Sequence, residues 1–144
     1  MDDELSQEAE ELWCTEQRQA VTDYLNREGL TFADVGQWPA WHVAPLIAVW
    51  AIESQCRPGW VGWWALSGDL PTDYTTCLAE RTPRQALRDI GQKWSDAAKL
   101  WAIGKQCESF SLGSSEQEYE LAPMLAARAT TLLDWASDDD LWEE

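Results

Sequence analysis

The polar side chains best placed to do chemistry lie between Gly68 and Tyr74, in the stretch GDLPTDY. Asp69 and Asp73 are four residues apart, and Thr72 and Tyr74 add two hydroxyl groups. Loops that leave a rigid strand often carry binding residues, so these four residues form a candidate binding site. The competing interpretation is a plain turn, because Gly, Asp and Pro form turns and Asp often accepts a hydrogen bond from the backbone that follows it.

The single histidine, His42, would act as a general base if the fold brought it to Glu53, Asp69 or Asp73. The spacing does not demand that arrangement, and a histidine between a tryptophan and a valine is more often a hydrogen-bonded structural residue. A small enzyme that uses Asp69, Asp73 and His42 is therefore an alternative to a binding protein. The four cysteines form no CxxC pair, so we expect neither a metal site nor a cofactor.

A second candidate binding segment is the acidic C-terminus, which includes Asp138, Asp139, Asp140 and Trp142. As a docking segment, it would offer Trp142 as an apolar anchor inside an acidic ring that complements a basic pocket. The alternative is a solubilising tail with Trp142 folded back on the body of the protein. The run lacks the spacing and the glycine of a calcium-binding loop.

The charge of the chain is strongly negative and unevenly distributed. Its 26 acidic and 10 basic residues give a net charge of −16, and 13 of the acids lie in residues 1–16 and 134–144, which contain no Lys or Arg. Phosphate binding needs clustered basic residues, so we expect no direct binding to nucleic acid. A basic protein is the partner class that this charge favours.

The first half of the chain is predicted to form a helix and a tryptophan-rich hairpin. Periodic apolar residues predict a helix from about Ser6, a good N-cap, to residues 26–28, ended by Gly29. Residues 30–45 are predicted to be a loop with one helical turn at 31–35. Two apolar strands are predicted at about 46–54 and 60–66, joined at 57–59, with a short third strand at 75–78.

The second half of the chain is predicted to form two helices. One starts at Thr82-Pro83, a capping signal with Pro at the first helical position, and ends at Gly104. Pro123 is expected to break a helix that begins near Ser115, so the last helix is predicted at about 122–136. The element order predicts a single α+β domain over 1–144, with a frayed N-terminus at 1–5 and an acidic tail at 138–144.

Several unusual strings carry a resemblance to a known family. They are WPAWHVAP at 38–45, GWVGWW at 59–64, GDLPTDY at 68–74 and DDDLW at 138–142. Through them the chain resembles an uncharacterised bacterial family of small, acidic, tryptophan-rich domains of unknown function. The resemblance implies a stand-alone bacterial domain of about this length, and it supplies no activity, substrate or site.

The sequence therefore favours a non-enzymatic acidic module of the inhibitor, immunity or regulatory type, which recognises a basic protein surface. An alternative is a nucleic-acid mimic that inhibits a DNA- or RNA-binding protein; such a mimic needs acids spaced along one continuous face. The N-terminus lacks the pattern of a signal peptide and no apolar run is long enough to span a membrane. We therefore expect a cytoplasmic protein without a membrane partner.

Overall fold

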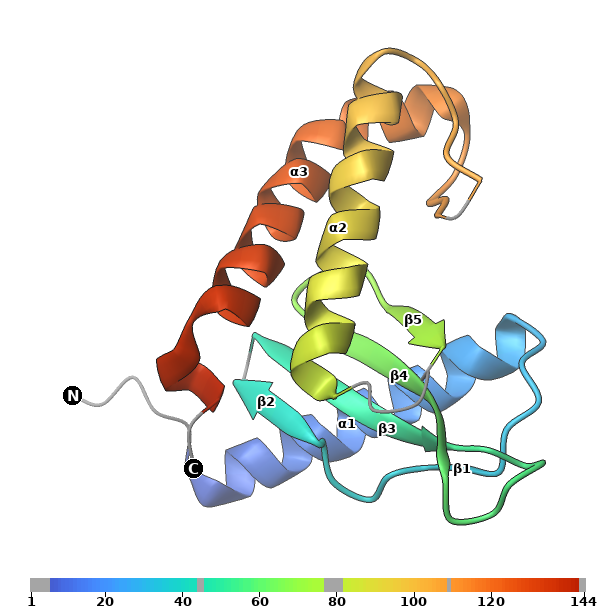
Figure 1. Ribbon diagram of the computed structural model, residues 1–144, viewed down its shortest axis with the longest axis vertical. Helices are drawn as coiled ribbons and strands as arrows, with labels where there is room; N and C mark the ends of the chain where they lie inside the picture. The colour runs from blue at the N-terminus through green and yellow to red at the C-terminus, as the bar shows by residue number, and fades with distance from the viewer. Residues whose placement is uncertain (1–5, 44–45, 77–81, 109, 143–144) are drawn as a thin grey trace. The chain divides into compact units, whose positions relative to one another are not determined.

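The computed structural model describes residues 6–43, 46–76, 82–108 and 110–142 of the chain (Figure 1). The chain divides into two compact units, Met1–Pro83 and Arg84–Glu144, which are described separately below. The prediction of a single domain over 1–144 is not tested by this division and stays a prediction. The frayed N-terminus predicted at 1–5 lies outside the described residues.

The first unit begins with helix α1, Gln7–Arg27. Ser6 is its N-cap, and the Ser6 hydroxyl accepts a hydrogen bond from the backbone N–H of Ala9 at 3.1 Å. Gly29 follows the helix with φ = +76°, a left-handed conformation that glycine adopts without strain. The predicted first helix is confirmed at both ends.

An antiparallel sheet of five strands fills the rest of the first unit (Figure 1). The central pair is β3, Ile47–Glu53, and β4, Val61–Gly68, with a register shift at Ile52 and Glu53. Strand β5, Asp73–Thr76, pairs with β4, while the short strands β1, Asp34–Val35, and β2, Trp41–Val43, both pair with β3. The two predicted strands of the tryptophan-rich hairpin are thereby confirmed.

Alternate residues of the sheet face α1 and build the core of this unit. Ala48, Trp50 and Ile52 of β3 are buried with Ala65 of β4 in one apolar cluster. Helix α1 contributes Cys14, Val21 and Leu25 to the same cluster. Since successive residues of a strand point to opposite faces, Ile47, Val49, Ala51 and Glu53 belong to the other face of β3.

Three predictions for the first unit were wrong in detail. Residues 30–45 are not a continuous loop, because Trp41–Val43 pairs with β3 as strand β2. Residues 31–35 form no helical turn: Asp34 and Val35 are strand β1, because their backbone extends along the edge of β3 and bonds to it. The third strand starts at Asp73, two residues earlier than predicted, since Asp73 and Tyr74 pair with Leu66 and Ala65 of β4. The end of that predicted strand, residues 77–78, lies outside the described residues.

The second unit is an antiparallel pair of helices, α2, Pro83–Ala102, and α3, Ser115–Ser137 (Figure 1). Gly91 of α2 lies against Leu132 and Leu133 of α3, and a Cβ atom at position 91 would come within 3.0 Å of the Leu132 side chain. The absence of a side chain at Gly91 therefore lets the two helices approach closely. Phe110, from the connection between them, stacks on Trp101 with 5.8 Å between ring centroids.

The predicted break at Pro123 does not occur, because α3 begins at Ser115 and continues through the proline. The start is fixed by a capping box: Ser114 accepts from the N–H of Gln117, and the Gln117 side chain accepts from the N–H of Ser114. Proline removes one backbone donor inside a helix, and α3 continues past Pro123 without that donor. Beyond α3, a short 3₁₀ helix, Asp139–Trp142, ends the described chain.

The elements confirm the predicted α+β class: one helix, an antiparallel sheet, then two helices. In the described part of the chain, no helix is both long and apolar enough to cross a membrane. Within the described residues, Cys14 and Cys56 are free thiols.

Candidate functional site

The predicted site at 68–74 is divided between a loop and a strand. Asp69 is exposed, and its backbone N–H donates to the carbonyl oxygen of Leu46 at 2.9 Å. Asp73 is only 3% exposed, and its Oδ1 accepts from the N–H of Tyr74 at 2.8 Å. Thr72 and Tyr74 are half-buried. Asp73 is the first residue of β5, so this local hydrogen bond lies at the start of a strand and not in the predicted turn.

Tyr74 instead belongs to an aromatic pair with Tyr24 of α1. Their ring centroids are 6.1 Å apart in an edge-to-face arrangement. Burial raises the pKa of Tyr24 strongly, and the negative charges of Asp73 and Glu28 add to that rise. Burial, Glu28 and Asp73 also raise the pKa of Tyr74. Both phenols therefore stay neutral at physiological pH, which makes them packing groups rather than bases.

His42 does not meet Asp73. His42 pairs with Ala48, and Ala48 with Ser67, whereas Asp73 pairs with Leu66, so His42 and Asp73 point to opposite faces of the sheet. His42 and Asp73 are also three strand spacings apart, a distance of about 14 Å across the sheet. The partner of His42 is Glu10 of α1, with Nε2 and Oε2 3.1 Å apart.

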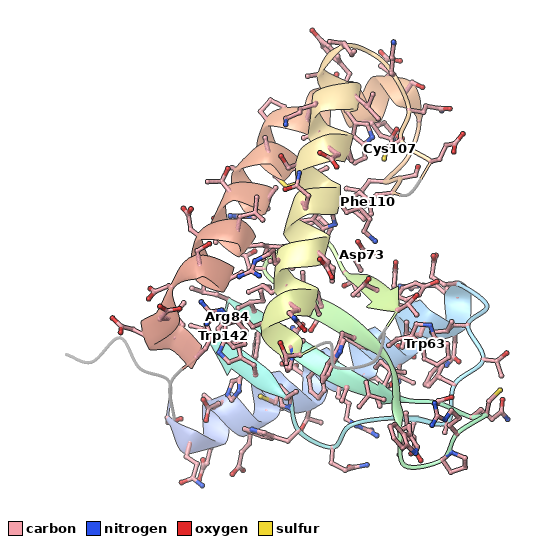
Figure 2. The ribbon with its side chains drawn as sticks, viewed as in Figure 1. Trp63, Asp73, Arg84, Cys107, Phe110 and Trp142 are labelled. Carbon is pink, nitrogen blue, oxygen red and sulfur yellow. The ribbon has the colours of Figure 1, made fainter. Side chains whose placement is uncertain are left out.

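The C-terminal candidate segment is folded onto the end of α3. The indole N–H of Trp142 donates to the carbonyl oxygen of Trp135 at 2.9 Å, and the Oδ1 of Asp138 accepts from the N–H of Asp140 at 3.1 Å. Asp139 forms an ion pair with Arg84 of α2 at 2.6 Å. Figure 2 shows Arg84 and Trp142 at the same end of this helix pair. Of the three aspartates, Asp140 is the one whose carboxylate forms neither a hydrogen bond nor an ion pair with the described residues.

A different site, which the sequence did not reveal, lies at the edge of the sheet in the first unit. It is a pocket of about 310 Å³ between β1, β3 and the start of β4, and we call it the hairpin pocket. Its lining includes Asp34, Gly36, Ala51, Glu53, Trp60 and Val61.

Two acidic residues line the hairpin pocket. Asp34 and Glu53 are direct cross-strand partners, and Glu53 in turn pairs with Val61 across the register shift, so the three residues are neighbours at this edge of the sheet. Like charges directly opposite each other on neighbouring strands are unfavourable in a free protein. The Arg18 guanidinium, paired with Asp34, offsets part of that repulsion, and a bound cation would relieve the rest.

Each carboxylate is held by one fixed contact. Asp34 Oδ1 accepts from Arg18 Nη2 at 2.9 Å, while the same guanidinium donates to the carbonyl oxygens of Val35 and Gly36. Glu53 Oε2 accepts from the N–H of Gly59 at 2.8 Å, which ties the carboxylate to the hairpin turn. Since a carboxylate has about four acceptor positions, both groups retain capacity to bind a further donor.

The aromatic wall of the pocket is Trp60, which is 61% exposed. The guanidinium of Arg57 lies over its ring, 4.3 Å from the centroid. The face of an indole ring attracts cations, and planar guanidinium groups stack on it well. The pocket therefore combines an exposed cation-binding ring with two carboxylates, which is the chemistry that recognises an arginine or a methylated or free lysine.

The sequence carried only a partial signal for this site. Glu53 stands out as the one charged residue in an otherwise apolar strand, residues 46–54. Asp34 gives no such signal, because the sequence predicts a helical turn at 31–35 and the pairing of Asp34 with Glu53 depends on the strand register.

Comparison with known proteins identifies a family. Residues 7–142 match the sequence model of a family described as a domain of unknown function, DUF4826. No curated protein and no solved structure is significantly similar to the chain.

Proposed function

This chain belongs to the DUF4826 family of domains of unknown function, and we propose that it is an acidic protein-binding module that captures a basic partner through the hairpin pocket. It would act as an inhibitor, immunity or regulatory protein rather than as an enzyme, in the cytoplasm of a bacterium. The observation that carries this proposal is the pairing of Asp34 with Glu53 beside the exposed Trp60.

An arginine side chain is the best occupant. Its planar guanidinium stacks on an indole ring and donates to a carboxylate with two parallel hydrogen bonds, whereas lysine offers a compact, strongly hydrated charge. Arg57 already places a guanidinium over Trp60 from within the chain. An arginine of the partner would take the place of Arg57 and also reach Glu53.

The exposed side of α1 supports the same partner class. Glu8, Glu11 and Glu16 are exposed there around Leu12, which is 61% exposed. Arg18 does not neutralise this surface, because its guanidinium is bonded to the segment 34–36. Exposed charges of one sign accelerate the encounter with a partner of opposite charge, and this effect weakens as salt increases.

The proposal is tested with a fluorescently labelled hexa-arginine peptide at physiological ionic strength, with hexa-lysine for comparison. Glu53→Gln keeps an acceptor for Gly59 and should weaken hexa-arginine binding about tenfold, since it removes one charge-assisted pair. Glu16→Gln, on the exposed side of α1, makes the same charge change outside the pocket and is the matched control. Trp60→Ala should also weaken binding, whereas Arg57→Gln should strengthen it by freeing the ring.

Two outcomes would contradict the proposal. If Glu53→Gln and Glu16→Gln weaken binding equally, the peptide responds to net charge and not to the pocket. If Arg57→Gln fails to strengthen binding, an arginine of the partner does not compete for Trp60.

The nucleic-acid mimic remains a second candidate because the exposed acids of α1 follow one helical stripe. It predicts that neutralising Glu8, Glu11 and Glu16 together weakens capture of a DNA-binding protein more than Glu53→Gln does, and that duplex DNA competes for the same protein. The opposite faces of His42 and Asp73 give no support to an enzyme that uses them together.

A further inference from the structure

The second unit contains a groove between α2 and α3 whose lining is mostly apolar and includes no acidic residue. Its volume is about 440 Å³, within the range of small-molecule sites. We call it the interhelical groove, and its lining includes Ala98, Lys99, Ala102, Tyr119, Ala122 and Ala126.

The groove is hollow because the facing positions carry small side chains. Ala98 and Ala102 are one turn apart on α2, and Ala122 and Ala126 are one turn apart on α3. Residues four apart on a helix lie on the same face, so the four alanines form a continuous apolar floor. Tyr119, which is 55% exposed, lies one turn before the α3 alanines and adds an aromatic wall.

Lys99 is the charged residue among those that line the groove. It is exposed, and within the described ranges its ammonium group has neither an ion pair nor a hydrogen bond. Asp96, one turn earlier on α2, accepts instead from Gln92 Nε2 at 3.0 Å. An unpaired cation at an apolar groove favours a ligand with one anionic end and an apolar body.

We propose that the interhelical groove binds an aliphatic monocarboxylate, with its chain on the alanine floor and its carboxylate against Lys99. The net charge of −16 argues against an acidic protein here, because long-range repulsion would oppose its approach. The positive charge of Lys99 would in turn repel a basic protein at this groove. A small monoanion experiences little of that repulsion and gains both the charge contact and the burial of its chain.

Decanoate is the probe, titrated by calorimetry below its micellar concentration, with decanol and decylamine as the neutral and cationic analogues. Decanoate should bind the wild-type chain with saturation, decanol more weakly, and decylamine least. Lys99→Gln should reduce decanoate affinity about tenfold, the loss of one charge-assisted contact, and leave decanol affinity unchanged. Lys105→Gln, the same charge change in the loop after α2, should leave both affinities unchanged.

Ala126→Leu tests the groove itself. Ala126 is exposed, and leucine is a good helix former, so this variant should fold while its larger side chain fills the groove and weakens both decanoate and decanol. Circular dichroism of each variant separates lost folding from lost binding, and Lys99→Arg should retain decanoate affinity.

Three results would overturn the proposal. They are the absence of saturable decanoate binding to the wild type, an equal effect of Lys99→Gln and Lys105→Gln, and groove occupation by an uncharged alanine-rich helical peptide but not by decanoate. None of these results bears on the hairpin pocket, which lies in the other unit.

Discussion

The indole N–H of Trp50 donates to the hydroxyl of Ser67 at 3.1 Å, between neighbouring strands, and both side chains are buried. Ser67→Ala would leave that N–H buried without a partner, so we expect a loss of about 1–3 kcal/mol in the free energy of unfolding. In a Trp50→Phe background the same substitution should cost much less, because no donor remains to be satisfied. Urea denaturation of the four variants of this cycle measures the coupling. If Ser67→Ala lowers the free energy of unfolding equally in both backgrounds, the hydrogen bond does not couple the two residues.

Trp64 is also buried, but unlike that of Trp50 its indole nitrogen has no hydrogen-bond partner within the described ranges. Trp64→Ala should cost about 3–5 kcal/mol through the cavity it creates. Trp64→Phe should cost less than Trp50→Phe, because it removes a buried donor that makes no hydrogen bond. Denaturant melts check the order. A Trp64→Ala change within experimental error would mean that this side chain contributes nothing to the core.

The tyrosine pair makes stability depend on alkaline pH. The pKa values of Tyr24 and Tyr74 are raised in the folded chain above the unfolded value of about 10. Above pH 10 the unfolded chain loses phenolic protons that the folded chain keeps, so the free energy of unfolding decreases as pH rises further. The contribution is fully present below pH 10. Urea melts at pH 9–11.5 should show this decrease, and Tyr24→Phe should reduce its slope, whereas Tyr119→Phe, at an exposed position, should not.

Much of the fold could be predicted because its signals are local. Ser6, Gly29 and Pro83 mark helix ends through their own backbone chemistry, and the apolar run before Glu53 marks a buried strand. The errors arose where the outcome depends on distant partners. Strand β1 exists because β3 offers it backbone hydrogen bonds, and nothing in residues 31–35 announces that. Pro123 alone predicts a helix break, whereas the Ser114 capping box sets the start of α3 before it.

The candidate sites show the same contrast between local signals and distant partners. The sequence could identify Asp73 and Asp139 as acids in turn-rich segments, but burial and the reach of Arg84 decide what they do. The hairpin pocket depends on the register that sets Asp34 opposite Glu53, and a shift by one residue would place one of them on the other face.

The ion pair between Arg84 and Asp139 joins the start of α2 to the residues that follow α3. Arg84 Nε also donates to the carbonyl oxygen of Ala136 at 2.6 Å, in the last turn of α3, where the helix dipole favours a cation. Arg84→Met should therefore lower the free energy of unfolding by about 1–2 kcal/mol, more than a solvent-exposed ion pair alone contributes.

The aspartates provide matched controls for Arg84. Asp139→Asn should cost less than about 1 kcal/mol, since this carboxylate is 82% exposed and its removal also takes a negative charge away from the C-terminal end of α3. Asp140→Asn makes the same charge change without losing the contact to Arg84, so stability should be unchanged or rise slightly. Thermal melts at low and high salt measure all three variants, and salt should reduce the difference between Asp139→Asn and Asp140→Asn. If those two variants behave identically at low salt, the Arg84 side chain stabilises α3 through Ala136 alone.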